Sequence, residues 1–327
     1  MTGTVRAFWI IAPGRGEIRS ESLPDVAGDR VLARTLFSGI SRGTEALVFM
    51  GRVPPSEYER MRAPFQKGDF PGPVKYGYSA VGVVEEGPQG LLGREVFCLH
   101  PHQERFVVPA ESVVSLPEDV PAARAVLAAN METAVNAVWD AGIGPGDRVA
   151  VVGAGVIGSL VAWLAGRIPG TDVTLVDLNP ERQRLAERLG VAFAAPGQAE
   201  GDCDVVVHAS GSETGLASAL ALAGNQARVV EMSWYGTTHP AVPLGEAFHS
   251  RRLSLISSQV GQLPPGRQPR WTHRRRLELA LQLLADAALD HLIAGSSPFE
   301  ALPEDMPGLL DDANDVLCHR VEYGREK

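Results

Sequence analysis

The hydrophobic pattern of the chain changes near residue 121. Before that point, short apolar runs alternate with Gly- and Pro-rich turns, as in "RVLARTLFSGI", "YSAVGVVEEG" and "ERFVVPAESVVSLP". Such runs are typical of short β-strands, so we expect a β-rich, barrel-like region without long helices. The segment "PAARAVLAANMETAVNAVWDAG" then carries apolar residues at helical spacing and ends in glycine, which predicts a helix.

Strands and helices are expected to alternate from there on. The runs "DRVAVVGAG", "DVTLVDLN", "CDVVVHASG" and "QARVVEMSWYG" predict buried strands, and the segments between them predict helices. A further helix, "RRRLELALQLLADAA", and a strand-like run, "VLCHRVEY", follow a polar loop. Continuous apolar strands separated by amphipathic helices imply a parallel sheet covered on both faces. The sequence therefore predicts an α/β protein with a doubly wound Rossmann sheet and a β-rich second domain.

A glycine motif connects the first of these strands to the following helix. Gly153-x-Gly155-x-x-Gly158 directly follows an apolar strand, and Asp177 ends the next strand. In this context the motif predicts a dinucleotide site, with the pyrophosphate at the helix N-terminus. An ordinary strand–helix turn without a ligand is the alternative. The residues assigned to cofactor contact here are Gly153, Gly155, Val156, Ile157, Gly158, Asp177 and Leu178.

Asp177 also indicates which dinucleotide binds. Its carboxylate is suited to accept both ribose hydroxyls of NAD, and it would repel a 2′-phosphate. No arginine directly follows it, because residues 178–180 are Leu, Asn and Pro. The sequence therefore favours NAD over NADP.

Charge and cysteine content exclude several classes of partner. The net charge of −9 argues against nucleic acid, which normally requires a basic face. No apolar run approaches the ~18 residues of a membrane span, and the N-terminus has no signal-peptide pattern. Three widely separated cysteines suit a reducing compartment, and the absence of a Cys-x-x-Cys pair excludes a four-thiolate zinc lobe. We expect a cytoplasmic protein that binds neither nucleic acid nor membrane.

The order of the regions, together with "GISRGTE", "KYGYSAVGVVEEG" and "GIGPGDRVAVVGAGVIG", resembles the medium-chain dehydrogenase/reductase superfamily of the zinc alcohol dehydrogenases. Within it, "SGISRGTE" resembles a bacterial branch related to bacteriochlorophyllide dehydrogenases. The resemblance implies a GroES-like catalytic domain at 1–125, a Rossmann dinucleotide-binding domain at 126–258 and a C-terminal return to the catalytic domain at 259–327. It also implies a homodimer paired through the edge of the Rossmann sheet.

The positions of the family's catalytic zinc ligands differ in this chain. They correspond to Ser41, to Tyr78 and to Ala129 or its neighbour Asn130. Serine and tyrosine are poor zinc ligands, alanine offers no donor, and the nearby Glu132 supplies only a single carboxylate. We therefore expect no catalytic zinc.

Without a metal, side chains must stabilise the oxygen that gains charge as hydride moves. Tyr78 is the first candidate because a phenol donates a hydrogen bond and can pass a proton. His100 aligns with a pocket position of the family and its usual pKa of ~6.5 suits acid–base exchange, while Ser41 would assist as a relay. The alternatives are a Tyr78 that only fills the vacated metal volume, and histidines satisfied by backbone carbonyls.

The resemblance places Arg42 at a cofactor phosphate, Thr133 near the nicotinamide, and Met131 and Glu132 beside the substrate. Independently of the resemblance, His102 would share a face with His100 if the stretch is extended. Trp234 and Tyr235 could line the nicotinamide or the mouth of the substrate site, and hydrophobic packing between domains is an equal alternative. His208 lies inside an apolar strand, and we interpret it as a satisfied core residue. The remaining assignments are Ser210, Met232 and Trp234 to the cofactor, and His102, Met131, Glu132 and Tyr235 to the substrate.

The leading hypothesis is thus a zinc-independent, NAD-dependent oxidoreductase that moves hydride between nicotinamide and a carbonyl or alcohol of a small polar substrate. One alternative is an NADPH-type quinone or enone reductase, against which Asp177 argues. Another is a non-catalytic NAD(H)-binding redox sensor, against which the polar cluster of Ser41, Tyr78, His100 and His102 argues.

Overall fold

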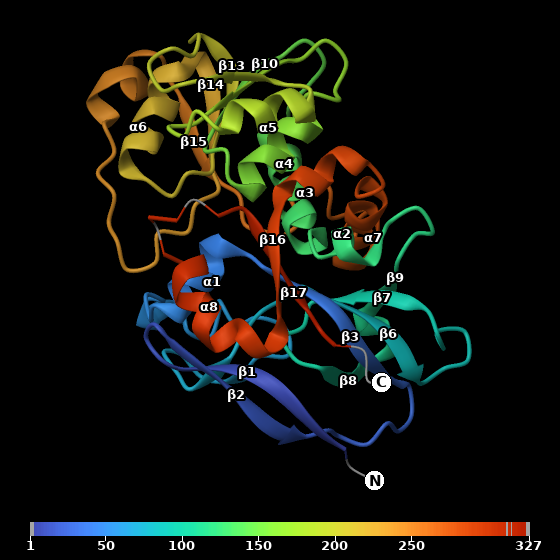
Figure 1. Ribbon diagram of the computed structural model, residues 1–327. Coiled ribbons are helices and arrows are strands. Elements are labelled where there is room, and N and C mark those ends of the chain that lie inside the picture. Colours follow the sequence, from blue (N-terminus) through green and yellow to red (C-terminus); the bar gives the residue numbers. More distant parts are fainter. Residues whose placement is uncertain (1–2, 312, 315, 325–327) are drawn as a thin grey trace. The chain divides into compact units, whose positions relative to one another are not determined.

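The computed structural model describes residues 3–311, 313–314 and 316–324, and the chain divides into two compact units (Figure 1). Unit 1 comprises residues 1–129 and 281–327, and unit 2 comprises residues 130–280. Helices α3 (Ala128–Ala141) and α7 (His273–Leu283) run across the two borders. Unit 2 extends beyond the expected border at 258 and includes most of α7, whose Arg276 bonds to Glu132 and Asn136 of α3.

Unit 1 contains two β-sheets. In the described residues one sheet has the order β2-β1-β5-β4, and the other has the order β16-β17-β3-β6-β7-β9, with β8 paired to β3. Pairing is antiparallel except between β16 and β17. The strands are β1 (Thr4–Ala12), β2 (Arg15–Ser22), β3 (Arg30–Ile40), β4 (Lys67–Gly68), β5 (Val74–Lys75), β6 (Ala80–Glu86), β7 (Glu95–Cys98), β8 (Arg105–Pro109), β9 (Val113–Ser115), β16 (Ile293–Pro298) and β17 (Cys318–Glu322).

Alternation along β3 explains the core of this unit. Val31, Ala33 and Thr35 are buried while the residues between them are partly exposed, as expected for a strand with one face on a core. The buried side packs with Phe106 and Val108 of β8. Helices α1 (Arg42–Phe49), α2 (Ala122–Ala125) and α8 (Leu302–Leu309) are short, in line with the β-rich pattern.

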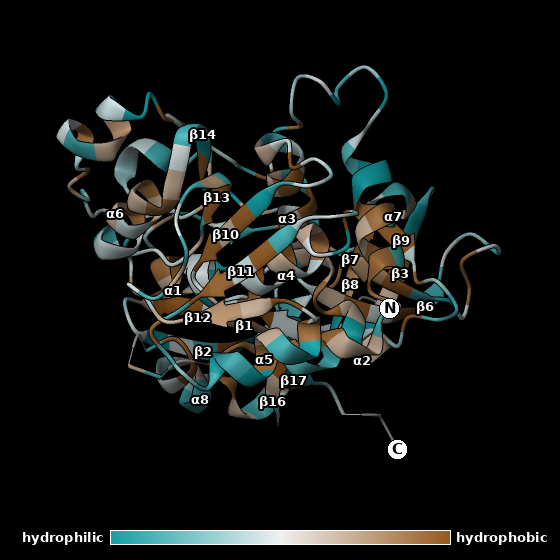
Figure 2. Cartoon of the chain, turned by 90° about the horizontal axis from the view of Figure 1, so that it is seen from above, coloured by the Kyte–Doolittle hydropathy of each residue, from teal (hydrophilic) through white to brown (hydrophobic). Residues whose placement is uncertain are grey.

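Unit 2 is built on a parallel sheet with the order β12-β11-β10-β13-β14-β15 within the described residues. The central strands β10 and β11 are mainly apolar (largely brown in Figure 2), as expected for a parallel sheet with helices on both faces. Figure 1 shows α6 on one side of the sheet, and α4 and α5 on the other. The elements are β10 (Arg148–Val152), α4 (Val156–Ala165), β11 (Asp172–Val176), α5 (Arg182–Leu189), β12 (Ala192–Ala194), β13 (Cys203–His208), α6 (Glu213–Leu222), β14 (Ala223–Glu231) and β15 (Ser254–Ser257). This confirms the expected fold class.

Three local predictions differ from the structure. The helix expected from Pro121 is divided into α2 and α3, and between them Leu127 N–H bonds to the Arg124 carbonyl in a tighter i→i+3 turn. Strand β14 ends at Glu231, so residues 232–236 form an irregular turn instead of a strand end. Strand β16 was not anticipated, because the polar sequence "IAGSSP" has no apolar period and forms a strand only by pairing with β17.

Candidate functional site

The glycine motif of unit 2 forms a tight turn between β10 and α4. Gly153 has φ +110°, and a Cβ there would lie 2.7 Å from Ser210 N. A Cβ on Gly158 would lie 1.8 Å from the Gly153 carbonyl oxygen. Helix α4 begins directly after Gly155, so its unpaired N–H groups are at this turn. The turn thus has the close backbone approach and the helix N-terminus that suit a pyrophosphate.

Asp177 lies beside this turn at the end of β11. Its Oδ2 accepts a hydrogen bond from Ala154 N at 2.6 Å, and its Oδ1 accepts one from Asn179 N at 2.8 Å. Each carboxylate oxygen has a second lone pair, so two acceptor positions stay available to ribose hydroxyls. The next side chain, Leu178, is 81% exposed, which offers an apolar contact next to the carboxylate.

Polar side chains gather at the ends of the adjacent strands β13 and β14. His208 is buried, and its Nδ1 lies 2.6 Å from Glu231 Oε2 while its Nε2 lies 2.7 Å from Ser210 Oγ. Tyr235 donates its hydroxyl to the same Glu231 oxygen at 3.0 Å, and Ser233 N donates to Oε1 at 2.7 Å. The Tyr235 hydroxyl is therefore turned toward Glu231, which argues against the predicted substrate contact through that group. Met232 and Trp234 lie half-buried in the same turn.

Glu231 was missed by the sequence analysis. Its only signal is that it is an acidic residue ending an otherwise apolar strand, "RVVE". Open α/β sheets bind ligands at the carboxyl ends of their strands, so the position of Glu231 predicts a ligand-site residue as well as the position of Ser210 does.

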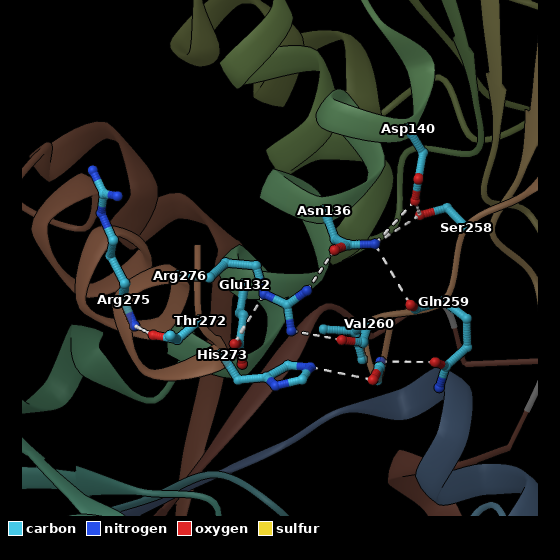
Figure 3. A network of polar contacts seen from close by, with 11 residues as sticks. Glu132, Asn136, Asp140, Ser258, Gln259, Val260, Thr272, His273, Arg275 and Arg276 are labelled. Atoms are coloured by element: carbon cyan, nitrogen blue, oxygen red, sulfur yellow. Dashed lines mark hydrogen bonds and ion pairs between the residues drawn. The ribbon is translucent and has the colours of Figure 1, made fainter. Parts of the chain in front are cut away.

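The start of α3 carries a buried ion pair (Figure 3). Glu132 Oε1 accepts from Arg276 Nε at 3.0 Å, and the Arg276 guanidinium also bonds to Asn136 Oδ1 and to the Val260 carbonyl. Burial raises the pKa of Glu132, and Arg276 opposes that rise. Because the carboxylate is engaged with Arg276, the structure favours a structural role for Glu132 over the predicted substrate contact.

Two further residues of α3 were assigned from the family resemblance. The Met131 side chain is 0% exposed, which argues against the predicted substrate contact. Thr133, assigned to the nicotinamide, lies half-buried on the same helix.

In unit 1, the loop between β3 and α1 meets Tyr78. Ser41 is the residue before α1, and its N–H donates to Glu45 Oε1 at 2.7 Å. The side chains of Ser41 and Thr44 lie near the Tyr78 hydroxyl and act to lower its pKa. Burial, and then the nearby Glu45, raise the pKa of Tyr78 well above its usual value, so the phenol keeps its proton at neutral pH.

Glu45 is itself held by a buried chain of hydrogen bonds. Its Oε2 lies 3.0 Å from His102 Nε2, His102 Nδ1 lies 2.7 Å from Ser38 Oγ, and Ser38 Oγ lies 3.0 Å from Tyr323 Oη. Both ring nitrogens of His102 are engaged and its side chain is buried. His102 is therefore connected to the Ser41 loop through Glu45, and its engaged, buried ring argues against the predicted substrate contact.

His100 lies in an apolar slot. Its ring stacks between Phe65 and Phe106, with centroid distances of 5.6 and 4.4 Å, and its Nδ1 lies 2.9 Å from the Pro101 carbonyl oxygen. Burial lowers the pKa of His100 to about 3. A histidine that is neutral throughout the physiological range has no second proton to donate, which argues against the predicted acid role.

Arg42, predicted to bind a cofactor phosphate, lies at the start of α1. Its Nη2 donates to the Asp311 carbonyl at 3.0 Å in an exposed position.

The predicted site residues thus form two groups. Ser41, Tyr78 and His102 lie in unit 1, and Gly153, Asp177 and Ser210 lie in unit 2.

The donor set around Ser41 does not suit the zinc ion of the alcohol dehydrogenases. Ser41 offers a hydroxyl, and Tyr78 offers a phenol that resists ionisation, whereas Zn²⁺ takes thiolate, imidazole and carboxylate ligands. Within residues 3–311, 313–314 and 316–324, no group of three or more His, Cys, Asp or Glu is placed to hold a metal ion. No helix in that same part of the chain is long and apolar enough to cross a bilayer.

The chain is similar in sequence to several known dehydrogenases. No protein-family model matches the chain. An uncharacterised zinc-type alcohol dehydrogenase-like protein of Haemophilus influenzae is 25% identical over 229 residues, 66% of this chain and 63% of that protein. D-guloside 3-dehydrogenase of Escherichia coli is 25% identical over 317 residues, 88% of this chain and 90% of that enzyme. Other matches are shorter: the L-threonine 3-dehydrogenase of Ruegeria pomeroyi matches at 30% identity over half of this chain and 42% of its own length.

Solved structures share the fold over nearly the whole chain. A putative zinc-binding dehydrogenase of Sinorhizobium meliloti, bound to NADP, has a TM-score of 0.78 at 19% identity and covers 98% of this chain and 99% of its own. A structure described as a short chain alcohol dehydrogenase of Escherichia coli, complexed with NADH, has a TM-score of 0.76 at 17% identity with the same coverage. The chain spans less than two thirds of the length of two of the relatives, 63% of the Haemophilus influenzae protein and 42% of the L-threonine 3-dehydrogenase. The names of these relatives are those of an alcohol dehydrogenase-like protein and of dehydrogenases.

Proposed function

We propose that the chain is a zinc-independent, NAD-dependent oxidoreductase that transfers hydride between nicotinamide and a carbonyl or alcohol of a small polar substrate. The observation that carries this proposal is the glycine turn with Asp177 held against Ala154 N–H. The turn suits a pyrophosphate, and a carboxylate with open lone pairs beside it suits an unphosphorylated ribose. NADP-bound and NADH-bound neighbours both exist, so the preference for NAD rests on Asp177.

The cofactor, when bound, would supply or accept the hydride. The residues of this chain would handle the oxygen of the substrate, which gains negative charge during reduction. Tyr78 is the proposed donor, because its raised pKa keeps the phenol protonated and hence able to donate a hydrogen bond. The hydroxyls of Ser41 and Thr44 would hold that phenol in place and can return its proton. Glu45 would fix the loop through the Ser41 N–H.

Zinc independence is the part of the proposal that separates this chain from its zinc-type relatives. It is supported by the chemistry of Ser41 and Tyr78, and "SGISRGTE" supports a place in the branch resembling bacteriochlorophyllide dehydrogenases. The remaining expectations, a small-molecule substrate, a cytoplasmic location and a homodimer, also remain proposals. For the dimer, β15 is one of the two edge strands of the described sheet, and its residues are exposed or half-buried, so its open side can pair with another strand.

The test combines metal analysis with cofactor titration. We expect purified protein to contain less than a tenth of an equivalent of zinc, to quench or shift NADH fluorescence on binding, and to oxidise NADH with members of a ketone and aldehyde panel. One equivalent of zinc that is required for turnover would refute the zinc-independent mechanism. Tight NADH binding without turnover on the whole panel would favour the non-catalytic sensor.

A further inference from the structure

A continuous chain of hydrogen bonds ends at the glycine turn of unit 2. It runs from Glu231 through His208 to Ser210, and Ser210 Oγ lies 2.9 Å from Ser212 Oγ. His208 is fully buried, the Glu231 side chain is 14% exposed, and Ser210 is exposed. The chain therefore begins inside unit 2 and reaches its surface next to Gly153, where a Cβ would lie 2.7 Å from Ser210 N.

The partners determine which way each hydrogen points. Burial alone would raise the pKa of Glu231, but the hydrogen bonds from His208 and Ser233 hold it below its usual value, so the carboxylate is ionised and only accepts. In the tautomer that carries its hydrogen on Nδ1, His208 donates to Glu231 and its Nε2 accepts from the Ser210 hydroxyl. With its hydrogen directed inward, Ser210 Oγ accepts from the Ser212 hydroxyl.

The outward side of the chain therefore presents lone pairs. Ser212 Oγ donates to Ser210 and accepts from Gly215 N at 3.0 Å, which leaves one of its lone pairs open. Ser210 Oγ has one more acceptor position, taken only by a long contact of 3.3 Å from Ser212 N. Two neighbouring oxygens that can only accept suit a pair of hydroxyl donors and disfavour phosphate oxygens, which are themselves acceptors.

Gly215 keeps space for this arrangement. A Cβ at Gly215 would lie 2.1 Å from Ser210 Oγ, 2.8 Å from His208 Nε2 and 2.8 Å from Ser212 Oγ. A side chain at residue 215 of α6 would displace the hydrogen-bonded groups of His208, Ser210 and Ser212. Gly215 of α6 does not have a positive φ, so the backbone conformation does not require glycine there. The glycine is required by the space that the hydrogen-bonded side chains occupy.

Strand order indicates which part of a dinucleotide would meet these oxygens. In the sheet β11 and β13 flank β10, so Asp177 lies on one side of the glycine turn and Ser210 on the other. A dinucleotide whose pyrophosphate lies at the turn extends to both sides. With the adenosine ribose at Asp177, the second ribose is on the β13 side.

We propose that His208 and Glu231 are positioning residues that present Ser210 and Ser212 as hydrogen-bond acceptors to the vicinal hydroxyls of the second ribose. This inference rests on the proposed dinucleotide site. It adds a recognition element of four side chains, from the buried His208 to the exposed Ser210, that acts on cofactor affinity without touching the cofactor's reacting ring.

The test is a binding titration with NADH, ADP-ribose and ADP, which need no substrate. ADP-ribose contains both riboses, and ADP lacks the second. We expect Ser210→Ala and His208→Leu to weaken NADH and ADP-ribose binding about 5- to 10-fold, the equivalent of one lost hydrogen bond of about 1–1.4 kcal/mol, and to leave ADP binding unchanged. His208→Gln, which can still accept from Ser210 and donate to Glu231, should retain affinity within about 2-fold.

A matched control is Ser218→Ala on helix α6, where the hydroxyl of the half-buried Ser218 donates to the Thr214 carbonyl. If wild-type protein binds NADH but Ser210→Ala matches Ser218→Ala, the inference fails and the proposed function stands. Equal weakening for all three ligands would show a structural role and would also overturn it. Failure of the wild type to bind any of the three would overturn the proposed function and the inference together. Thermal unfolding of each variant identifies any that fails to fold, and Ser210→Ala alone then decides.

Discussion

Replacing Arg276 by methionine should destabilise unit 2 more than any change at a neighbouring surface arginine. The side chains of Arg276 and Glu132 are 2% and 6% exposed, so the pair is removed from water. Arg276→Met leaves the Glu132 carboxylate buried without its cation, and removes a donor from Asn136 Oδ1 and from the Val260 carbonyl (Figure 3). Breaking a buried pair from one side typically costs about 3–5 kcal/mol, which we expect here.

The double variant Arg276→Met, Glu132→Leu should recover part of that loss. It removes both charges, and apolar replacement of a buried pair is often neutral. Asn136 and the Val260 carbonyl still lack a donor, and unsatisfied buried groups of this kind cost about 1–3 kcal/mol. We therefore expect the double variant to be about 1–3 kcal/mol less stable than wild type, and so more stable than the single one.

Urea unfolding followed by tryptophan fluorescence measures this, because four of the five tryptophans lie in unit 2 and Trp139 and Trp271 pack with a centroid distance of 4.7 Å. Arg274→Met is the control. Arg274 lies two residues before Arg276 on the same helix, and its pair with Glu278 is about half exposed, so its loss should cost at most about 0.5 kcal/mol. Equal unfolding midpoints for Arg276→Met and Arg274→Met would refute the reasoning, and would reopen Glu132 as a ligand contact.

Three other predictions address the candidate sites. Asp177→Ala should weaken NADH binding about 10- to 100-fold, from the loss of charge-assisted hydrogen bonds to ribose, and narrow the NADH/NADPH affinity ratio; an unchanged ratio in fluorescence titrations would show that the ribose contact lies elsewhere. Tyr78→Phe should lower kcat about 10²–10³-fold with little change in NADH affinity, and wild-type turnover would reduce Tyr78 to a packing residue. His100→Phe should be more resistant to acid. The unfolded chain binds the His100 proton below a pH of about 6.5, whereas its folded pKa is about 3, so wild-type stability falls by up to about 1.4 kcal/mol per pH unit as the pH decreases between those values, and urea midpoints of wild type and variant should diverge below pH 6.

Short-range patterns in the sequence, namely hydrophobic periodicity and glycine spacing, predicted the main architecture. Apolar strands alternating with amphipathic helices gave the parallel sheet, and the glycine spacing before α4 gave the turn that Gly153 and Gly158 form. Both signals are local, because they come from the periodicity of buried positions and from the steric limits of a non-glycine residue in a tight turn. The same locality explains why β16 was missed, since that strand depends on its partner β17 and not on its own composition.

The roles of single polar residues required the tertiary structure. The sequence placed Glu132 and His102 among substrate contacts, but Glu132 meets Arg276, 144 residues away, and His102 meets Glu45 and Ser38, 57 and 64 residues away. The sequence made His100 an acid–base candidate, but in the structure it stacks with Phe65 and Phe106, and burial lowers its pKa to about 3.

The sequence by itself determined the fold class and the glycine turn with Asp177 beside it, and it led to the proposal that Ser41 and Tyr78 stand at the positions of zinc ligands. Only the tertiary structure decided which polar side chains are already satisfied by one another and which still offer hydrogen-bond capacity, as Ser210 and Ser212 do. The physical reason is that backbone geometry follows from neighbours in the sequence, whereas the protonation and hydrogen-bonding state of a buried group depends on desolvation and on partners that folding brings from distant segments.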